Sequence, residues 1–111
     1  MKEKQKSNFL EFLRNEQDNC LAKAEKLTAD GRVDEAVLQK VRANIFGIFE
    51  TVTKVPDQTP ETVVRLMDKI PAQWYHSLET AIRHGDFEKE TLERVKITAM
   101  DEIKNYWKEN F

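Results

Sequence analysis

Few residues in this sequence have types and spacings that could perform chemistry. The only two histidines, His76 and His84, lie eight residues apart in one segment, and neither belongs to a Glu-x-x-His pair of the kind that di-iron helical bundles use. The chain also has no Cys-x-x-Cys pair for zinc, no glycine-rich phosphate loop and no Gly-x-Ser-x-Gly motif. The pattern favours a protein without catalytic activity, and we expect no bound metal or cofactor.

One aromatic cluster is a candidate ligand site. Trp74, Tyr75 and His76 follow Pro71, and a proline inside a helical pattern leaves backbone groups without their usual partners. These side chains could therefore line a pocket for a small ligand or substrate. The alternative interpretation is that the aromatic side chains belong to the hydrophobic core, which is the commoner role at helical spacing.

Composition and charge exclude several classes of partner. The formal net charge of the 111 residues is −2, which argues against nucleic-acid binding because phosphate contacts need a concentrated basic face. No apolar run approaches the roughly 20 residues of a membrane helix, and the polar start MKEKQKSN does not resemble a signal peptide. The single cysteine, Cys20, cannot form an internal disulfide, so we expect a cytoplasmic protein. We also expect the Cys20 thiol to be buried.

The stretch from Asp34 to Val55 is expected to organise the fold. Its apolar residues recur at alternating steps of three and four, which places them on one seam of a helix: Leu38, Val41, Ile45, Ile48, Val52 and Val55. Phe46 and Phe49 widen this seam, so the helix should contact more than one neighbour.

Glycines and prolines divide the rest of the chain into further helices. Asp30-Gly31 and His84-Gly85-Asp86 predict two short turns, and Pro71 predicts a break after Ile70. The expected helices span residues 7 or 8 to 28, 34 to 55, 60 to 69, 72 to 84, and 87 to 110.

An internal repeat is suggested by the two glycine turns. Sliding the chain by 54 residues places Gly31 on Gly85 and superposes much of the apolar pattern, so residues 7–57 and 60–111 could be two copies of one helical hairpin. Two unrelated hairpins of similar length would give the same pattern. Either way, we expect one all-α domain over residues 1–111, an antiparallel up-down-up-down four-helix bundle with its third helix broken at Pro71.

Surplus apolar surface gives the leading functional hypothesis, a structural or protein-interaction module that associates with itself or with another protein. The last helix carries a second apolar line beside its core stripe, and we expect it to form a homodimer interface through Ile97, Met100 and Trp107, with Phe46 from the central helix. The bundle could instead bury this line within one chain. Two other hypotheses are the ligand site near Trp74 and an export or assembly chaperone that holds a partner helix.

Overall fold

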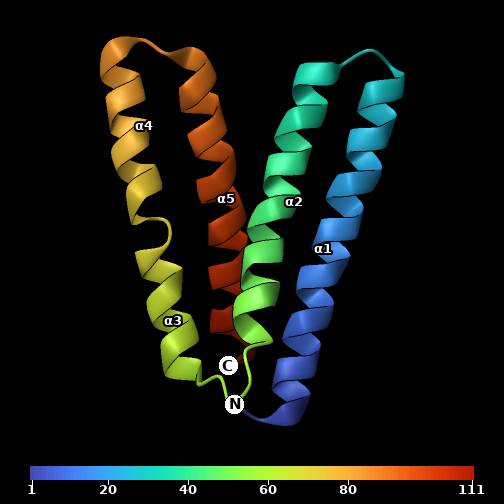
Figure 1. The fold of residues 1–111 in the computed structure, drawn as a ribbon, viewed down its shortest axis with the longest axis vertical. Coiled ribbons are helices and arrows are strands. Elements are labelled where there is room, and N and C mark those ends of the chain that lie inside the picture. Colours follow the sequence, from blue (N-terminus) through green and yellow to red (C-terminus); the bar gives the residue numbers. More distant parts are fainter.

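The structure is a computed structural model that describes all residues 1–111, and it contains five α-helices and no strand. An antiparallel hairpin of α1 and α2 is followed by a second hairpin in which α3 and α4 together pair with α5 (Figure 1). This confirms the predicted all-α, up-down-up-down arrangement of two hairpins. The helices are α1 (Glu3–Ala29), α2 (Val33–Thr53), α3 (Pro60–Lys69), α4 (Ala72–His84) and α5 (Phe87–Asn110).

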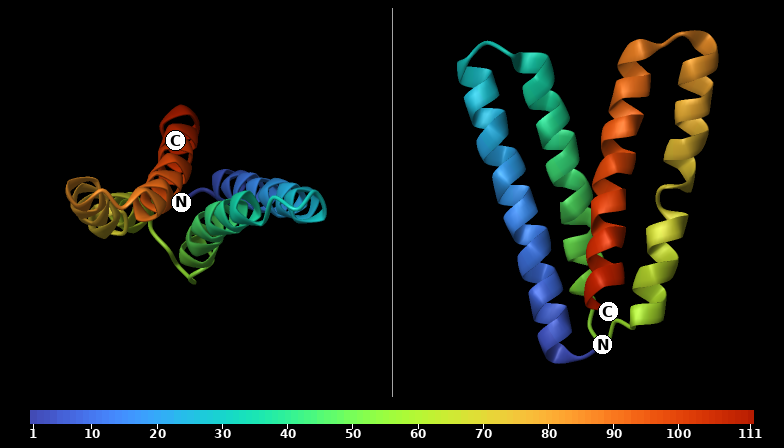
Figure 2. Two further views of the ribbon diagram at one scale, coloured as in Figure 1. Left: turned by 90° about the horizontal axis from the view of Figure 1, so that it is seen from above. Right: turned by 180° about the vertical axis from the view of Figure 1, so that it is seen from behind.

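The two hairpins meet at one end of the molecule and diverge toward the other, so the ribbon has the outline of a V (Figure 2). Both chain termini lie at the joined end, which we call the closed end, and the α1–α2 and α4–α5 turns lie at the open end (Figure 1). The inner helices α2 and α5 make most of the contact between the hairpins. The radius of gyration is 15.1 Å, against about 13 Å for a compact domain of this length. The bundle is therefore incompletely packed toward its open end.

The break in the third helix lies where the sequence predicts it. α3 ends at Lys69 and α4 begins at Ala72, because Pro71 has no amide hydrogen to continue the helical ladder. The start of α3 is also as expected, since the Thr59 hydroxyl accepts a hydrogen bond from the Thr62 amide at 3.2 Å. The break and the cap together place α3 and α4 as two short helices along one side of α5.

The two turns at the open end have the same hydrogen-bonding pattern. Gly31 and Gly85 both have positive φ angles, 77° and 67°, which glycine adopts without a steric penalty. In each turn, the amide after the glycine donates to the carbonyl five residues earlier, Arg32 to Leu27 at 2.8 Å and Asp86 to Ala81 at 2.9 Å. Both turns therefore stop a helix in the way that the sequence predicts.

The bounds of α1 and α2 differ from the predicted bounds. α1 begins at Glu3 rather than near Ser7, and α2 begins at Val33 and ends at Thr53. Asp34 therefore lies inside the first turn of α2, where its negative charge is favourable beside the positive end of the helix dipole. The bounds of α5 are as predicted, and Asp86 caps it by accepting a hydrogen bond from the Lys89 amide at 3.1 Å.

The hydrophobic core gathers residues of α1, α2, α3 and α5. Phe9 is fully buried there, with its ring centroid 5.7 Å from that of Tyr106, 5.3 Å from that of Trp107 and 6.0 Å from that of Phe111. Aromatic pairs at such distances stabilise a fold beyond the area that they bury. The other core residues are Leu13, Cys20, Ala43, Ile45, Phe46, Phe49, Val63, Met67, Ala99, Met100 and Ile103.

The buried face of α2 is rotated from the predicted seam. Of the six seam residues only Ile45 is buried, and Val55 lies beyond the end of the helix in an exposed position. Phe46 and Phe49 are instead fully buried in the core, and α2 packs against both α1 and α5. The prediction that this helix contacts more than one neighbour is confirmed.

Polar side chains also connect α1 with α2. Gln17 Nε2 donates to Glu50 Oε1 at 3.3 Å, and Glu50 Oε2 lies 3.2 Å from Arg14 and 3.4 Å from Lys54. Burial acts to raise the pKa of Glu50, but the Gln17 hydrogen bond and the two positive charges outweigh it and hold this pKa below its ordinary value. The ionised form of Glu50 is therefore the form that the fold favours.

The burial pattern follows the 54-residue offset at several positions. Ile45 and Ala99 are both buried, as are Phe49 and Ile103. Two further equivalent residues, Gln39 on α2 and Glu93 on α5, each have a buried side-chain oxygen without a hydrogen-bond partner. These similarities agree with two related hairpins, and the internal duplication itself stays a prediction.

Candidate interaction cleft

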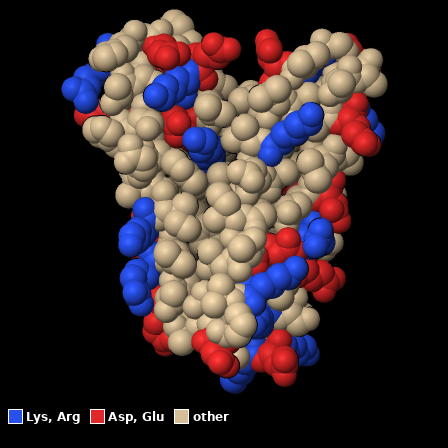
Figure 3. Space-filling model, in the orientation of Figure 1, with Lys and Arg blue, Asp and Glu red and all other residues tan.

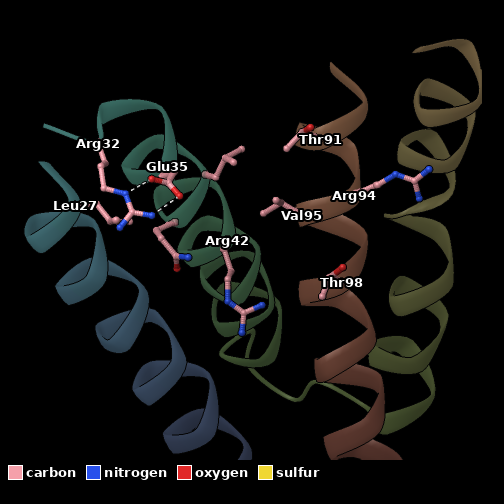
Figure 4. A pocket seen from close by; sticks show the side chains of 10 residues that line it. Leu27, Arg32, Glu35, Arg42, Thr91, Arg94, Val95 and Thr98 are labelled. Atoms are coloured by element: carbon pink, nitrogen blue, oxygen red, sulfur yellow. Dashed lines mark hydrogen bonds and ion pairs between the residues drawn. The ribbon is translucent and has the colours of Figure 1, made fainter. Parts of the chain in front are cut away.

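Two cavities lie between α2 and α5 at the open end of the molecule. A first cavity of about 530 Å³ is bounded by α1, α2 and α5 (Figure 4). A second cavity of about 610 Å³ is bounded by α2 and α5 nearer their first turns. Leu38 and Thr91 line both cavities. We treat the two cavities as one feature and call it the α2/α5 cleft.

The middle of the cleft wall is apolar. Leu38 on α2 and Val95 on α5 line the first cavity together with Leu27, and Leu92 lines the second. Figure 4 shows Val95 directed from α5 toward α2. All four side chains are only half-buried, although three of them lie on the inner helices of the bundle. The cleft therefore contains an apolar strip that this chain does not cover, among lining residues that are mainly polar or charged.

Further apolar residues lie around the mouth of the cleft. Val37 in the second cavity is 49% exposed, and Val33 and Phe87, in the first turns of α2 and α5, are 56% and 77% exposed. Single exposed apolar residues are common on protein surfaces, but residues gathered around an apolar cleft indicate an interaction surface.

Charged side chains line both cavities of the cleft. The second cavity is lined by Asp34, Asp86 and Glu88 against Lys89, which gives a formal net charge of −2. The three arginines of the first cavity are each paired with a carboxylate, Arg32 with Glu35, Arg42 with Glu102 and Arg94 with Glu90. In Figure 3, Asp and Glu side chains flank the notch at the open end, and Lys and Arg side chains lie below them on both arms.

Arg42 forms the floor of the cleft and connects the two hairpins. Its guanidinium pairs with Glu102 of α5 and lies 3.6 Å from Glu16 of α1, and its central carbon is 5.1 Å from the centroid of the Phe46 ring. Burial acts to lower the pKa of Arg42, but the hydrogen bond and the charge of Glu102 outweigh it and raise this pKa. The ion pair therefore helps to fix where the two arms begin to separate.

Cys20 lies beside this floor as a buried thiol. Its side chain is in the core, and burial raises the pKa of the thiol, although the Arg42 charge acts in the opposite direction. A thiol with a raised pKa is a weak nucleophile. Cys20 therefore has the structural environment that the sequence predicts for it.

The predicted homodimer residues do not form one surface. Phe46 is 0% and Met100 is 1% exposed, and both belong to the core of the single chain, so the expectation that they face a second copy is corrected for these two. Ile97 is half-buried, and Trp107 packs edge-on against Phe9 at 5.3 Å. The apolar line on α5 is buried in part because α3 and α4 pack beside that helix, an arrangement that periodicity alone does not specify.

The residues of the predicted ligand pocket at the helix break line neither cavity of the α2/α5 cleft. Trp74 is half-buried, with the Lys96 ammonium 6.0 Å from its ring centroid, and it packs against the core. Tyr75 and His76 are exposed on α4. The three side chains therefore do not converge on a common space, and a ligand role for them stays a prediction.

The cleft is not predicted from the sequence, although the sequence contains one signal of it. Leu38 and Val41 on one helix, and Leu92 and Val95 on the other, are equivalent under the 54-residue offset. Equivalent apolar pairs on two parallel inner helices can face each other. The sequence does not show that the hairpins diverge, and this divergence is what keeps the two apolar pairs apart. Arg42 was missed because an ion pair between distant helices leaves no local pattern.

Two general features complete the description of the surface. No group of three or more His, Cys, Asp or Glu side chains is arranged to hold a metal ion. None of the five helices is both long enough and apolar enough to cross a membrane. In comparisons with known proteins, no protein-family model, no curated protein and no solved structure matches this chain.

Proposed function

We propose that this protein is a protein-interaction module and that the α2/α5 cleft is its binding surface for amphipathic helices. The observation that supports the proposal is the uncovered apolar wall formed by Leu38, Leu92 and Val95. The same faces of α2 and α5 are buried against each other lower down, where Ile45 and Ala99 lie in the core. The apolar stripe thus continues toward the open end, beyond the point where α2 and α5 cover each other.

A helix is the occupant that fits the chemistry of this wall. The axes of packed helices lie 8–10 Å apart. Apolar residues that recur every three or four positions on one helix form a ridge, which fits into a groove on the helix packed against it. The polar groups at the rim, including Gln39, Thr91 and Thr98, suit the charged or polar flanks of an amphipathic helix. A rim of this kind around an apolar centre is the usual anatomy of a protein interface.

A labelled synthetic peptide tests this function. The probe is a fluorescein-labelled amphipathic helix with leucine at each a and d heptad position and mixed glutamate and lysine elsewhere, titrated with the protein and followed by fluorescence anisotropy. We expect saturable binding that the double substitution Leu38→Glu/Val95→Glu weakens by about tenfold or more, because it places two charges in the apolar wall.

The matched control is Leu21→Glu. Leu21 is 48% exposed on α1 and does not line the cleft, so this variant introduces the same kind of charge elsewhere. It should bind the peptide as the unaltered protein does. Equal binding by the cleft variant and the unaltered protein, or no binding by either, would show that the cleft is not a helix-binding surface.

A further inference from the structure

We propose that Arg42 is a switchable latch between the two hairpins. It holds them together when it pairs with Glu102 of α5, and it releases them when it pairs with Glu16 of α1 alone. The proposal goes beyond helix binding and does not depend on what occupies the cleft, because it concerns how far the two arms can separate. Three features of the structure support it.

The first feature is that one cation lies between two carboxylates of different hairpins. Arg42 Nη2 pairs with Glu102 Oε2 and also lies 3.6 Å from Glu16 Oε2. Arg42 and Glu16 belong to the first hairpin, whereas Glu102 belongs to the second. A guanidinium that moves from Glu102 to Glu16 therefore keeps a carboxylate partner, while the ion pair between the hairpins is lost.

The second feature is that this ion pair has no substitute. Apart from Arg42–Glu102, every ion pair of the structure joins two residues of the same hairpin. The hydrogen bond from the Gln5 side chain to the Asn110 carbonyl also joins the hairpins, but it lies beside the chain termini at the closed end. At the floor of the cleft, the charge of Arg42 is therefore what ties α2 to α5.

The third feature is the way in which the guanidinium is held. Its central carbon lies 5.1 Å from the centroid of the Phe46 ring, and Phe46 is fully buried in the core. The Arg42 side chain is only 19% exposed, against 31% for Glu16 and 43% for Glu102. The core thus fixes the cation, whereas either carboxylate can leave it for water without becoming an unpaired buried charge.

Release of the latch should widen the range over which the arms separate. On the closed-end side of Arg42, the hairpins stay joined by the core, which includes Phe49 of α2 and Ile103 of α5. On the open-end side, the facing residues Leu38 and Val95 are only half-buried. Because salt weakens ion pairs that are partly exposed, the separation of the arms should also depend on the salt concentration.

Distances between spin labels on the two arms test the proposal with the intact chain. Leu21 on α1 and Ile82 on α4 are 48% and 50% exposed, so cysteines at these positions accept nitroxide labels while the buried Cys20 thiol stays unlabelled. Double electron–electron resonance then gives the distribution of distances between the labels. Glu102→Gln should shift this distribution to longer distances, whereas the matched variant Glu16→Gln should leave it unchanged, because only Glu102 connects Arg42 to the second hairpin.

Salt gives a second measurement that needs no substitution at the latch. Raising the salt concentration from about 0.05 M to about 1 M should move the distribution of the labelled protein toward that of Glu102→Gln. The distribution of Glu102→Gln itself should respond little. Circular dichroism shows whether each labelled variant is folded, and the salt series decides the question if Glu102→Gln is not.

Two results would overturn the latch. The first is a distribution that is the same in folded Glu102→Gln and in the labelled protein, or that does not change with salt. The second is an equal shift in Glu102→Gln and Glu16→Gln, which would show that both carboxylates only stabilise the joint. These measurements contain no labelled helix, so their outcome is independent of the helix titration that tests the proposed function.

Discussion

Replacing Ile45 with alanine should remove a large part of the stability of this protein. The side chain is 2% exposed in the core, and the substitution deletes three methyl or methylene groups. At about 0.8 kcal/mol for each buried group the transfer term is about 2.4 kcal/mol, and the remaining cavity brings the expected loss to about 2–5 kcal/mol. A domain of this size has about 5–15 kcal/mol in total, so the loss is readily measured.

The same substitution at Ile48 provides the matched control. Ile48 lies three residues further along α2 and is only half-buried, so part of the deleted surface is already in contact with water. Ile48→Ala should therefore cost about 1–2 kcal/mol. Urea denaturation followed by circular dichroism gives both values from the change in midpoint at constant slope. Equal losses for the two variants, or a loss below about 1 kcal/mol for Ile45→Ala, would refute the buried face assigned to α2.

Three other predictions concern the turns, the ionisable groups and the thiol. Gly85→Ala should cost about 1 kcal/mol in denaturation, and Gly31→Ala a similar amount, because each φ is positive while no atom within 4 Å would obstruct the added Cβ. The pKa of Glu50 is lowered in the folded state, so its contribution to stability should be present above its unfolded pKa and be lost as the pH falls through the lower folded pKa. Glu50→Gln should therefore flatten this part of the plot of stability against pH, measured by acid denaturation. An unchanged plot would contradict the lowered pKa of Glu50. Cys20 should react slowly with a thiol reagent in the native protein and rapidly in urea, and fast native labelling would show that this thiol is not buried.

Local chemistry made much of the fold predictable from the sequence. The two glycine turns, the cap at Asp86 and the break at Pro71 each depend on a few adjacent residues, and the bounds of α3, α4 and α5 follow from them. The start of α1 was predicted too late because Glu3 and its polar neighbours carry no apolar stripe, although the helix extends over them. The paired hairpins then follow from amphipathic helices joined by short turns.

The cleft could not be predicted because it depends on how far the hairpins diverge. The hairpins are joined below the cleft, where Phe9 of α1 stacks against Tyr106 of α5 and Arg42 of α2 pairs with Glu102 of α5. Periodicity shows which face of a helix is apolar but not which part of that face is covered. Phe46 and Met100 are therefore predicted at an interface although they are buried, and Leu38 is predicted in the core-facing seam although it is only half-buried.

The concentration of the core toward the closed end also has a consequence for motion. Near the open end each arm is held by contacts within its own hairpin, so its backbone hydrogen bonds can break by local opening while the closed end stays folded. Amide hydrogens in the first turns of α2 and α5 should exchange with solvent sooner than those around Phe49 and Ile103. Slower exchange in the first turns after addition of the labelled helix would then report that the cleft has been filled.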